Sequence, residues 1–344
     1  MTWNIFKDSA KEWQHHFKMH RGHYRQSYNW GEYKKLMGWK ILRLKKIDRS
    51  GNQTLVQVTY KKFLFFSAIY IPGYISGNTE LLDKHFRRAL IKFTNSKFVY
   101  IRIDNNSILF ESQNLLISNN GWKRPMYREH TSMTLEIEID KDNSNFVDNI
   151  RKNWKKSYKK SVKRYEESKV SFKITNYPNV TELISIDRVM TKSRKIYTNH
   201  SENEFSFLVD TSGHNVFFVI AYSSNGEPIS YRAMIYFDNQ GWDLGGATTP
   251  EGKELLIDYF LMIELLKKAS SLKIKNYNLG DIGQEKKIGV YNFKKGLGGK
   301  EQTYSGEWEW SNIPFLRLVI NSIIFFLMLN SARKFFPLIN NIKF

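Results

Sequence analysis

The spacing of hydrophobic residues in the first half of the chain predicts two helices followed by strands. Apolar positions recur with a helical period over residues 10–20 and 29–36. Alternating or continuous apolar runs, which are typical of strands, then occupy residues 39–47, 53–60, 63–71 and 97–104. A helical pattern over residues 79–93 precedes the last of these runs.

The second half of the chain repeats this order. Strand-like runs cover residues 170–175, 215–222, 228–237 and 241–248, followed by a helix over 254–269 and a strand over 275–281. Successive strands, then a helix, then one more strand in each half predict two similar units. We therefore expect a mixed α/β (α+β) fold with domains at residues 1–142 and 143–312, divided in the polar stretch 140–145.

The carboxyl-terminal segment, residues 313–344, differs from both halves. A mostly apolar run from Leu318 to Leu329 lies between Arg317 and Arg333, and it is too short to span a bilayer. A buried helix and a helix in the membrane interface both fit this pattern. We favour an anionic membrane surface as partner, with a helix that can be removed without unfolding the two units. The amino terminus has no apolar signal core, so we expect a cytoplasmic protein, peripheral at the inner face of the membrane.

Charge narrows the choice of partners. The chain has 344 residues, and its 53 basic and 33 acidic side chains give a net charge of +20, which favours anionic partners. Because the chain has no cysteine, it has no disulfide, thiolate metal site or cysteine nucleophile.

Much of this charge lies on one predicted helix that begins near residue 146. Its apolar stripe is Phe146, Ile150, Trp154, Tyr158 and Val162. The opposite face could be simply solvated, or it could bind an anion, because its like charges repel one another. These cations are Arg151, Lys152, Lys155, Lys156, Lys159, Lys160, Lys163 and Arg164.

The sequence lacks the motifs of serine hydrolases and of zinc-dependent hydrolases. There is no G-x-S-x-G elbow and no HExxH motif, and the adjacent His15 and His16 cannot share a helix face, so we expect no metal. Asp104 and Asp281 end predicted strands, where ligands often bind, although each could instead be a helix cap, which we favour for Asp281. The stretch "IGVYNFKKGLGG" (288–299) has lysines beside glycines but fits neither common phosphate-binding loop.

Several motifs, taken in order, resemble the FemABX aminoacyltransferases and their tandem GNAT relatives. The segments "YRQSYNWGEYKKLMGWKILRL", "AIYIPGYISG" and "YIRIDNN" resemble motifs of the family's first unit. The basic helix resembles the one that opens its second unit, and "YNLGDIGQ", "IGVYNFKKGLGG" and "EQTYSGEWEW" resemble its carboxyl-terminal signature. The resemblance covers nearly the whole chain and implies two GNAT-like folds in tandem that form an amide from an activated acyl group.

The resemblance also implies roles for individual residues. Lys294 would stabilise the tetrahedral oxyanion and Asp104 would receive the proton of the amine or orient the acceptor. We expect Lys295, next to Lys294 in an extended segment, to point the other way. The implied substrate contacts are Phe293, Tyr291, Lys34, Trp30, Arg102 and His200, and the implied tRNA-binding or anion-binding residues are Lys155, Lys156, Lys159, Lys160 and Lys163. For Lys34 and for the lysine pair, a purely solvated role remains open.

The sequence departs from the family at three places. An acyl-CoA phosphate loop is not evident near "GGATTPEGKE", Asn105 replaces a proline, and His200 stands where compact members carry an arginine. We expect no tightly bound cofactor and an aminoacyl-tRNA-dependent aminoacyltransferase of peptidoglycan bridge synthesis, acting on a nucleotide- or lipid-linked precursor. The alternatives are an acyl-CoA-dependent N-acyltransferase acting on an amino sugar for surface polysaccharide, and a non-catalytic binding protein on an inactive fold.

Overall fold

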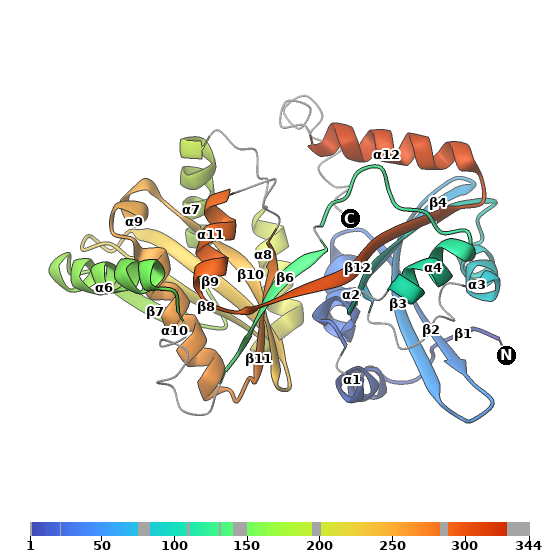
Figure 1. Cartoon of the computed structure of the whole chain (residues 1–344), viewed down its shortest axis with the longest axis horizontal. Coiled ribbons are helices and arrows are strands. Elements are labelled where there is room, and N and C mark those ends of the chain that lie inside the picture. The colour runs from blue at the N-terminus through green and yellow to red at the C-terminus, as the bar shows by residue number, and fades with distance from the viewer. Residues whose placement is uncertain are drawn as a thin grey trace. The chain divides into compact units, whose positions relative to one another are not determined.

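The computed structural model describes residues 2–20, 22–74, 83–108, 111–130, 132–139, 150–194, 201–282 and 288–328 (Figure 1). The chain divides into a first unit, Met1–Ser132 with Thr303–Phe344, and a second unit, Met133–Gln302. Each unit is described separately below.

The first unit is a mixed sheet with helices. Its strands pair in the order β1-β2-β3-β4-β5-β12. β4 and β5 are parallel and are joined through helix α3, whereas the other pairs are antiparallel. Its elements are β1 (Asn4–Ile5), α1 (Ala10–Met19), η1 (Tyr24–Gln26), α2 (Tyr28–Leu36), β2 (Lys40–Ile47), β3 (Gln53–Phe63), β4 (Phe66–Tyr74), α3 (Lys84–Thr94), β5 (Phe98–Ile108), α4 (Glu111–Asn119), β12 (Lys300–Ser311) and α12 (Pro314–Met328).

The second unit repeats this arrangement in the order β7-β8-β9-β10-β11-β6. β10 and β11 are parallel and are joined through α9 and α10, and the neighbouring pairs are antiparallel. Its elements are β6 (Met133–Glu138), α6 (Lys152–Glu167), β7 (Ser171–Thr175), α7 (Val180–Arg194), α8 (Glu202–Ser212), η3 (Gly213–Asn215), β8 (Val216–Tyr222), β9 (Pro228–Phe237), β10 (Gln240–Thr248), α9 (Pro250–Glu254), α10 (Ile257–Ser271), β11 (Asn276–Asp281) and α11 (Ile288–Gly296).

Two strands lie within one predicted unit, bounded at residues 142 and 312, but join the sheet of the other unit. β6 begins at Met133 and pairs with β11 of the second unit. Most of β12 pairs with β5 of the first unit, where Arg102 forms an ion pair with Glu307. The boundaries are therefore corrected to residue 132 and residue 303, because the sixth strand of each sheet comes from outside the predicted unit.

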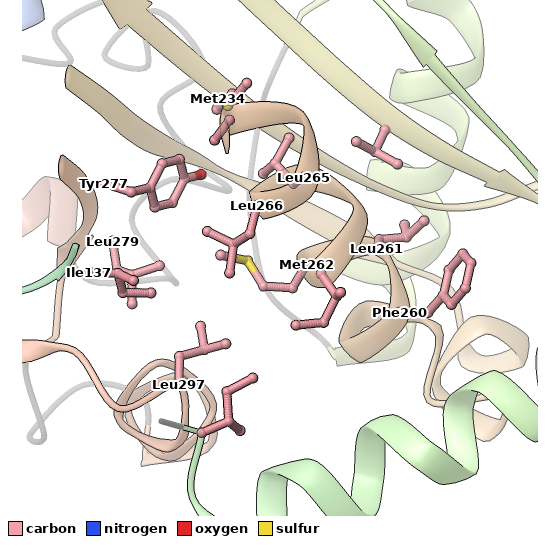
Figure 2. Packing of buried hydrophobic residues seen from close by; sticks show 14 of the residues in the cluster. Ile137, Met234, Phe260, Leu261, Met262, Leu265, Leu266, Tyr277, Leu279 and Leu297 are labelled. Atoms are coloured by element: carbon pink, nitrogen blue, oxygen red, sulfur yellow. The ribbon is translucent and has the colours of Figure 1, made fainter. Parts of the chain in front are cut away.

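The core of the second unit forms around α10, which is apolar on nearly every side (Figure 2). Phe260, Leu261, Met262, Leu265 and Leu266 are buried there, and Tyr277 and Leu279 of β11 complete the cluster. α10 can be apolar all round because it lies on the sheet and is covered by α6. Each fully buried large side chain contributes roughly 1.5–3 kcal/mol.

Helix α12 packs on the first unit through one face only. Ile320 and Ile324 are buried against Tyr100 of β5, whereas Phe315 and Leu318 are exposed. One face of α12 therefore belongs to the core, as the buried-helix interpretation expects, and the membrane-interface interpretation stays a prediction. None of the helices that the structure describes is long and apolar enough to cross a membrane.

Candidate functional site

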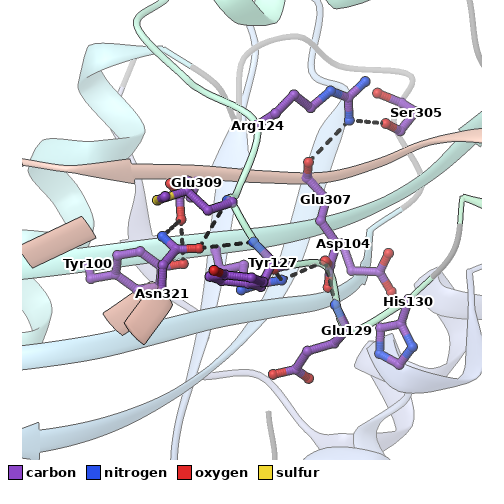
Figure 3. A network of polar contacts seen from close by, with 12 residues as sticks. Tyr100, Asp104, Arg124, Tyr127, Glu129, His130, Ser305, Glu307, Glu309 and Asn321 are labelled. Atoms are coloured by element: carbon purple, nitrogen blue, oxygen red, sulfur yellow. Dashed lines mark hydrogen bonds and ion pairs between the residues drawn. The ribbon is translucent and has the colours of Figure 1, made fainter. Parts of the chain in front are cut away.

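A cluster of charged side chains lies around Asp104 in the first unit (Figure 3), and Asp104 is inside β5 and not at its end as predicted, because the pairing with β12 continues to Ile108. Asp104 Oδ2 lies 3.3 Å from Nη1 of Arg25, which comes from η1. The same guanidinium nitrogen lies 3.2 Å from Nε2 of His130, a contact in which the arginine can only be the donor. His23 packs against the backbone of Gly73, where an added Cβ would lie 2.4 Å from Nδ1 of His23.

Two carboxyl groups of this cluster bind protons more readily than usual. Burial raises the pKa of Asp104 to about 6, although Arg25 opposes the shift. Burial likewise raises the pKa of Glu129 to about 7, against the positive charges of Arg102, Lys34 and Arg25. A carboxylate whose pKa lies near neutrality is suited to accept a proton from a reacting amine.

Arg102 was predicted to contact the substrate, and the structure contradicts this prediction. Its side chain is fully buried, and Nη2 donates to Glu307 Oε2 at 2.6 Å and to the carbonyl of Tyr127 at 2.7 Å. Glu307 also accepts from the backbone N–H of Glu129 at 3.0 Å. Arg102 therefore positions Glu307, and through it Glu129, without reaching the surface.

Lys34 and Trp30 lie on α2, one helical turn apart, as predicted. The Lys34 ammonium lies 5.8 Å from the ring centre of Trp30 and 5.4 Å from that of Trp39. Because its charge acts on Glu129, Lys34 belongs to the same electrostatic cluster as Arg25 and Asp104. Sequence reasoning missed Arg25, Glu129 and His130, of which only Arg25 lay inside a quoted motif.

In the second unit, Lys294 lies on a helix and not in the extended segment that we expected. α11 covers Ile288–Gly296, and consecutive helical residues differ by about 100° around the axis. The Lys294 ammonium donates to the carbonyl of Leu279 at 2.5 Å and to that of Asp281 at 3.2 Å. It therefore binds the end of β11, where the backbone bends at Gly280, whose φ is +69°.

An ion pair on neighbouring strands lies beside this ammonium. Nη2 of Arg232 on β9 lies 3.1 Å from both carboxylate oxygens of Asp243 on β10, and Asp243 Oδ2 lies 3.8 Å from Nζ of Lys294. Asp243 follows Trp242, the last β10 residue paired in parallel with β11. The Lys294 ammonium thus lies at the carboxyl end of β11, beyond the point where β10 and β11 stop pairing, and the carboxyl end of a parallel strand is a common place for ligands. No sequence motif pointed to Arg232 or Asp243.

The remaining predicted contacts divide between the core and the surface. Phe293 is half-buried between Trp154 and Tyr259, with ring centres 5.7 Å and 5.2 Å away. Tyr291 is a core residue whose hydroxyl bonds Lys295 at 2.6 Å, so the predicted substrate contact at Tyr291 is not supported. His200 lies outside the described residues.

The cationic face of α6 is fixed against the end of α11. The backbone N–H of Arg151 donates to the carbonyl of Gly296 at 2.9 Å. Gly296 also packs on Trp154, which leaves no room for a side chain there. Lys156, Lys159, Lys160 and Lys163 are exposed and Lys155 is half-buried. The row of charge therefore begins beside the helix that carries Lys294.

In the turn after β10, two backbone N–H groups are hydrogen-bonded within the turn itself. Thr249 caps α9, where its hydroxyl accepts from Gly252 N at 3.2 Å and its carbonyl accepts from Lys253 N at 3.0 Å. An added Cβ on Gly252 would lie 2.9 Å from the carbonyl oxygen of Ile229. A phosphate-binding loop needs backbone amides that point at the ligand, and these two point inward. In the part of the chain that the structure describes, no group of three or more metal-binding side chains converges.

Comparison with known proteins identifies the fold of the chain through solved structures, and not through sequence families. No protein-family model and no curated protein matches the sequence. The crystal structure of FemX matches with a TM-score of 0.72 at 15% identity, covering 93% of this chain and all of FemX.

Two further structures match more distantly. The structure of L-PGS from Bacillus licheniformis has a TM-score of 0.51 at 9% identity, covering 91% of this chain and 96% of that one. The carboxyl-terminal domain of a putative lysylphosphatidylglycerol synthetase from Agrobacterium fabrum has the same score at 10% identity, covering 91% and 95%. The chain therefore has the FemX-like, tandem GNAT-like fold that its resemblance to the FemABX proteins led us to expect.

Proposed function

We propose that this protein is an acyltransferase that forms an amide on an amino group of an anionic cell-envelope precursor, with aminoacyl-tRNA as donor. The observation that carries the proposal is the position of Lys294, whose ammonium is fixed at the carboxyl end of β11, beside Asp243 of β10. The FemX-like fold supports the reaction class. A fixed cation of this kind is suited to a developing oxyanion.

The reaction requires one bond to form and one to break. The amine nitrogen attacks the ester carbonyl of the donor, and the Lys294 ammonium stabilises the negative charge on the carbonyl oxygen. The intermediate then collapses, the carbon–oxygen ester bond breaks, and the ribose hydroxyl leaves as the amide forms. The proton released by the amine passes to the ribose oxygen, which leaves as the hydroxyl.

Two features of the second unit favour tRNA over acyl-CoA as donor. The amides of Gly252 and Lys253 are already used within α9, where an acyl-CoA phosphate would need them. The exposed lysines of α6 extend from the end of α11, and a row of cations suits a nucleic-acid backbone.

In the first unit, Lys34 and Arg25 supply positive charge beside the two carboxyl groups. We assign the phosphates of the acceptor to these cations. An acceptor linked to a nucleotide or to a lipid pyrophosphate has the required chemistry.

A donor competition assay tests the proposal. Purified protein is given labelled aminoacyl-tRNAs and labelled acyl-CoAs in parallel, each with nucleotide-linked peptidoglycan precursors and nucleotide-linked amino sugars. We expect amide-linked label from tRNA on the peptide precursor, formed at least about a hundredfold more slowly with Lys294→Met. Transfer from acyl-CoA alone would favour the N-acyltransferase, whereas transfer from neither donor by an intact protein would contradict the acyltransferase.

The α6 lysines allow a second test. Replacing Lys156, Lys159 and Lys160 with glutamine should weaken tRNA binding and lower the slope of log affinity against log salt by roughly 2, at about 0.7–0.9 per phosphate contact. The matched control replaces Lys173, Lys192 and Lys275, which are exposed on other elements of the second unit. Equal effects of the two triple variants would show that only net charge matters.

A further inference from the structure

The tip of the β3–β4 hairpin exposes three consecutive apolar side chains. Phe63 ends β3 and Phe66 begins β4, and Phe63, Leu64 and Phe65 have exposed fractions of 51%, 87% and 69%. Leu64 has a φ of +47°, a conformation that glycine or asparagine adopts at lower cost in tight turns. The tip thus combines solvent-exposed apolar side chains with an unfavourable backbone conformation at Leu64. A hairpin turn with polar residues and a glycine would fold without either cost.

This tip lies beside the start of α12 in the same unit (Figure 1). The backbone N–H of Phe98 donates to the carbonyl of Phe65 at 2.9 Å. One residue earlier, the carbonyl of Lys97 accepts from the side-chain amide of Asn312 at 2.8 Å, two residues before α12 begins. Phe66 packs on the cluster that holds Ile320.

The outward face of α12 continues the apolar surface. Phe315, Leu318, Phe325 and Phe326 are all exposed, at 67%, 54%, 37% and 57%. At 100° per residue they fall on one side of the helix, opposite the buried Ile320 and Ile324. Two separate elements therefore present large apolar side chains at one edge of the first unit. Single exposed apolar residues are common on protein surfaces, whereas a group of this kind indicates an interaction site.

The charges on the segments that form this edge are all positive, and one of them, that of Arg317, is paired with Glu309 of β12. Three segments form it: residues 61–66, 92–98 and 312–328. They contain no aspartate or glutamate. Their cations are Lys61, Lys62, Lys92, Lys97 and Arg317. Such an edge complements an anionic surface.

We propose that the hairpin tip and the outward stripe of α12 together form a membrane-docking face for a bilayer rich in anionic lipid. The phenylalanine and leucine side chains enter the boundary between headgroups and acyl chains, and the flanking lysines remain at the headgroups. A tip whose central leucine is 87% exposed projects from the sheet, which suits insertion into a fluid interface. This proposal does not depend on the acyltransferase reaction.

Vesicle flotation with the full-length protein tests the proposal. The vesicles are phosphatidylcholine alone, or phosphatidylcholine with about 30% phosphatidylglycerol. We expect the protein to bind the anionic vesicles at least about tenfold more tightly than the neutral ones. Leu64→Asn with Phe65→Ser, and separately Phe315→Ser with Leu318→Ser, should each weaken this binding about tenfold or more.

A matched control and a folding check complete the design. Leu115→Ser with Leu116→Ser changes two exposed leucines of α4, outside the three segments, and should leave binding unchanged. Because asparagine tolerates the backbone of position 64, the tip variant should melt at or above the temperature of the unchanged protein. Its transfer activity on a water-soluble acceptor should also be unchanged, which separates this proposal from the proposed function.

Three results would overturn the proposal. Equal binding to neutral and anionic vesicles is one, and full binding by both the tip and the stripe variants is another. The third is a dimer in sedimentation velocity that the tip variant converts to a monomer while vesicle binding persists, because the tip would then contact a second copy of the chain.

Discussion

Replacement of Lys294 by methionine should abolish most of the turnover and leave the fold intact. Methionine keeps most of the side-chain volume but removes the cation, and losing one oxyanion-stabilising group costs about 2.7–4 kcal/mol of barrier, or about a hundred- to a thousandfold in kcat. The carbonyls of Leu279 and Asp281 also lose a donor. This should lower the free energy of unfolding by about 1–2 kcal/mol. Steady-state kinetics and urea denaturation measure the two effects.

Lys295 is the control for this variant. It lies on the same helix, where its ammonium donates to the hydroxyl of Tyr291 at 2.6 Å and forms an ion pair with Glu301 at 2.7 Å. Tyr291 is in the core and Glu301 is exposed, so neither contact involves the end of β11. Lys295→Met should therefore leave kcat within a few-fold. Similar small losses for both substitutions would mean that the two lysines only stabilise α11.

Asp104 makes the stability of the first unit depend on pH in a specific direction. Its pKa in the folded protein is about 6, above the usual 3.8, because the side chain is buried. The folded state therefore binds the proton more tightly than the unfolded state between these values. This contribution to the unfolding free energy is favourable at low pH, falls by about 3 kcal/mol as the pH rises from about 4 to about 6, and then stays constant.

Asp104→Asn should remove this dependence. Asparagine does not titrate, so the difference in unfolding free energy between variant and unchanged protein should shift in favour of the variant between pH 4.5 and pH 7. Urea denaturation followed by tryptophan fluorescence at several pH values measures the difference. Parallel curves for the two proteins would show that Asp104 has an ordinary pKa.

Some site residues could be predicted from sequence and others could not. Lys294, Asp104 and Lys34 lie inside contiguous motifs that a sequence displays directly. Arg102 also lies in a motif, yet its partner Glu307 is 205 residues away, so its burial follows from a strand pairing that no local pattern encodes. Asp243 and Glu129 became visible only when strands from distant parts of the chain were placed together.

Among the elements, α12 is held by a charged anchor as well as by apolar contacts. The guanidinium of Arg317 lies 2.6 Å from Glu309, which is fully buried on β12 and also accepts from Tyr100 and Asn321, each at 2.8 Å. Breaking a buried ion pair by removing one partner costs about 3–5 kcal/mol. Arg317→Met should lower the unfolding free energy by about 3 kcal/mol, because two neutral partners of Glu309 remain.

Urea denaturation of a double-mutant cycle isolates this pair. Arg317→Met combined with Glu309→Gln should recover part of the loss, since the buried charge is then absent. The comparison variant is Lys163→Met, whose ion pair with Glu167 is exposed and should be worth less than about 1 kcal/mol. Removal of residues 314–344 should accordingly destabilise the first unit, contrary to our expectation that this segment is separable from the fold.

Where the sequence predicted an element poorly, the cause is physical: contacts with distant parts of the chain determine the structure there. α11 holds two glycines and two lysines, which indicate a turn, yet Tyr291, Phe293 and Gly296 pack on α6 and the core and stabilise a helix. Strongly periodic segments such as residues 254–269 were predicted well because their own apolar pattern determines the structure, although α10 begins only at Ile257.

At the scale of the whole molecule, the two units share a strand order but differ in where their last strand originates. β6 lies immediately before the rest of the second unit, so residues 133–302 contain strands β6 to β11, the strands that the structure describes for that unit. β12 follows the second unit in sequence and pairs with β5 of the first. The hydrophobic pattern predicted the repeat because both units obey the same local periodicities. The pattern could not assign β12 to the first unit, because the apolar pattern of a strand does not indicate which other strand it pairs with.

This difference predicts that the two units fold independently to different extents. A fragment of residues 133–302 should unfold cooperatively in urea, because its sheet and the core around α10 are contained within it. A fragment of residues 1–132 should lack a cooperative transition. Without β12, β5 has an unpaired edge, the buried Arg102 loses Glu307, and Trp308 leaves the core. The uncompensated arginine alone costs about 3–5 kcal/mol, much of the stability of a typical domain. Adding residues 303–344 as a separate peptide should restore the transition, as measured by circular dichroism. Cooperative unfolding of residues 1–132 alone would show that β12 closes a sheet that is already stable.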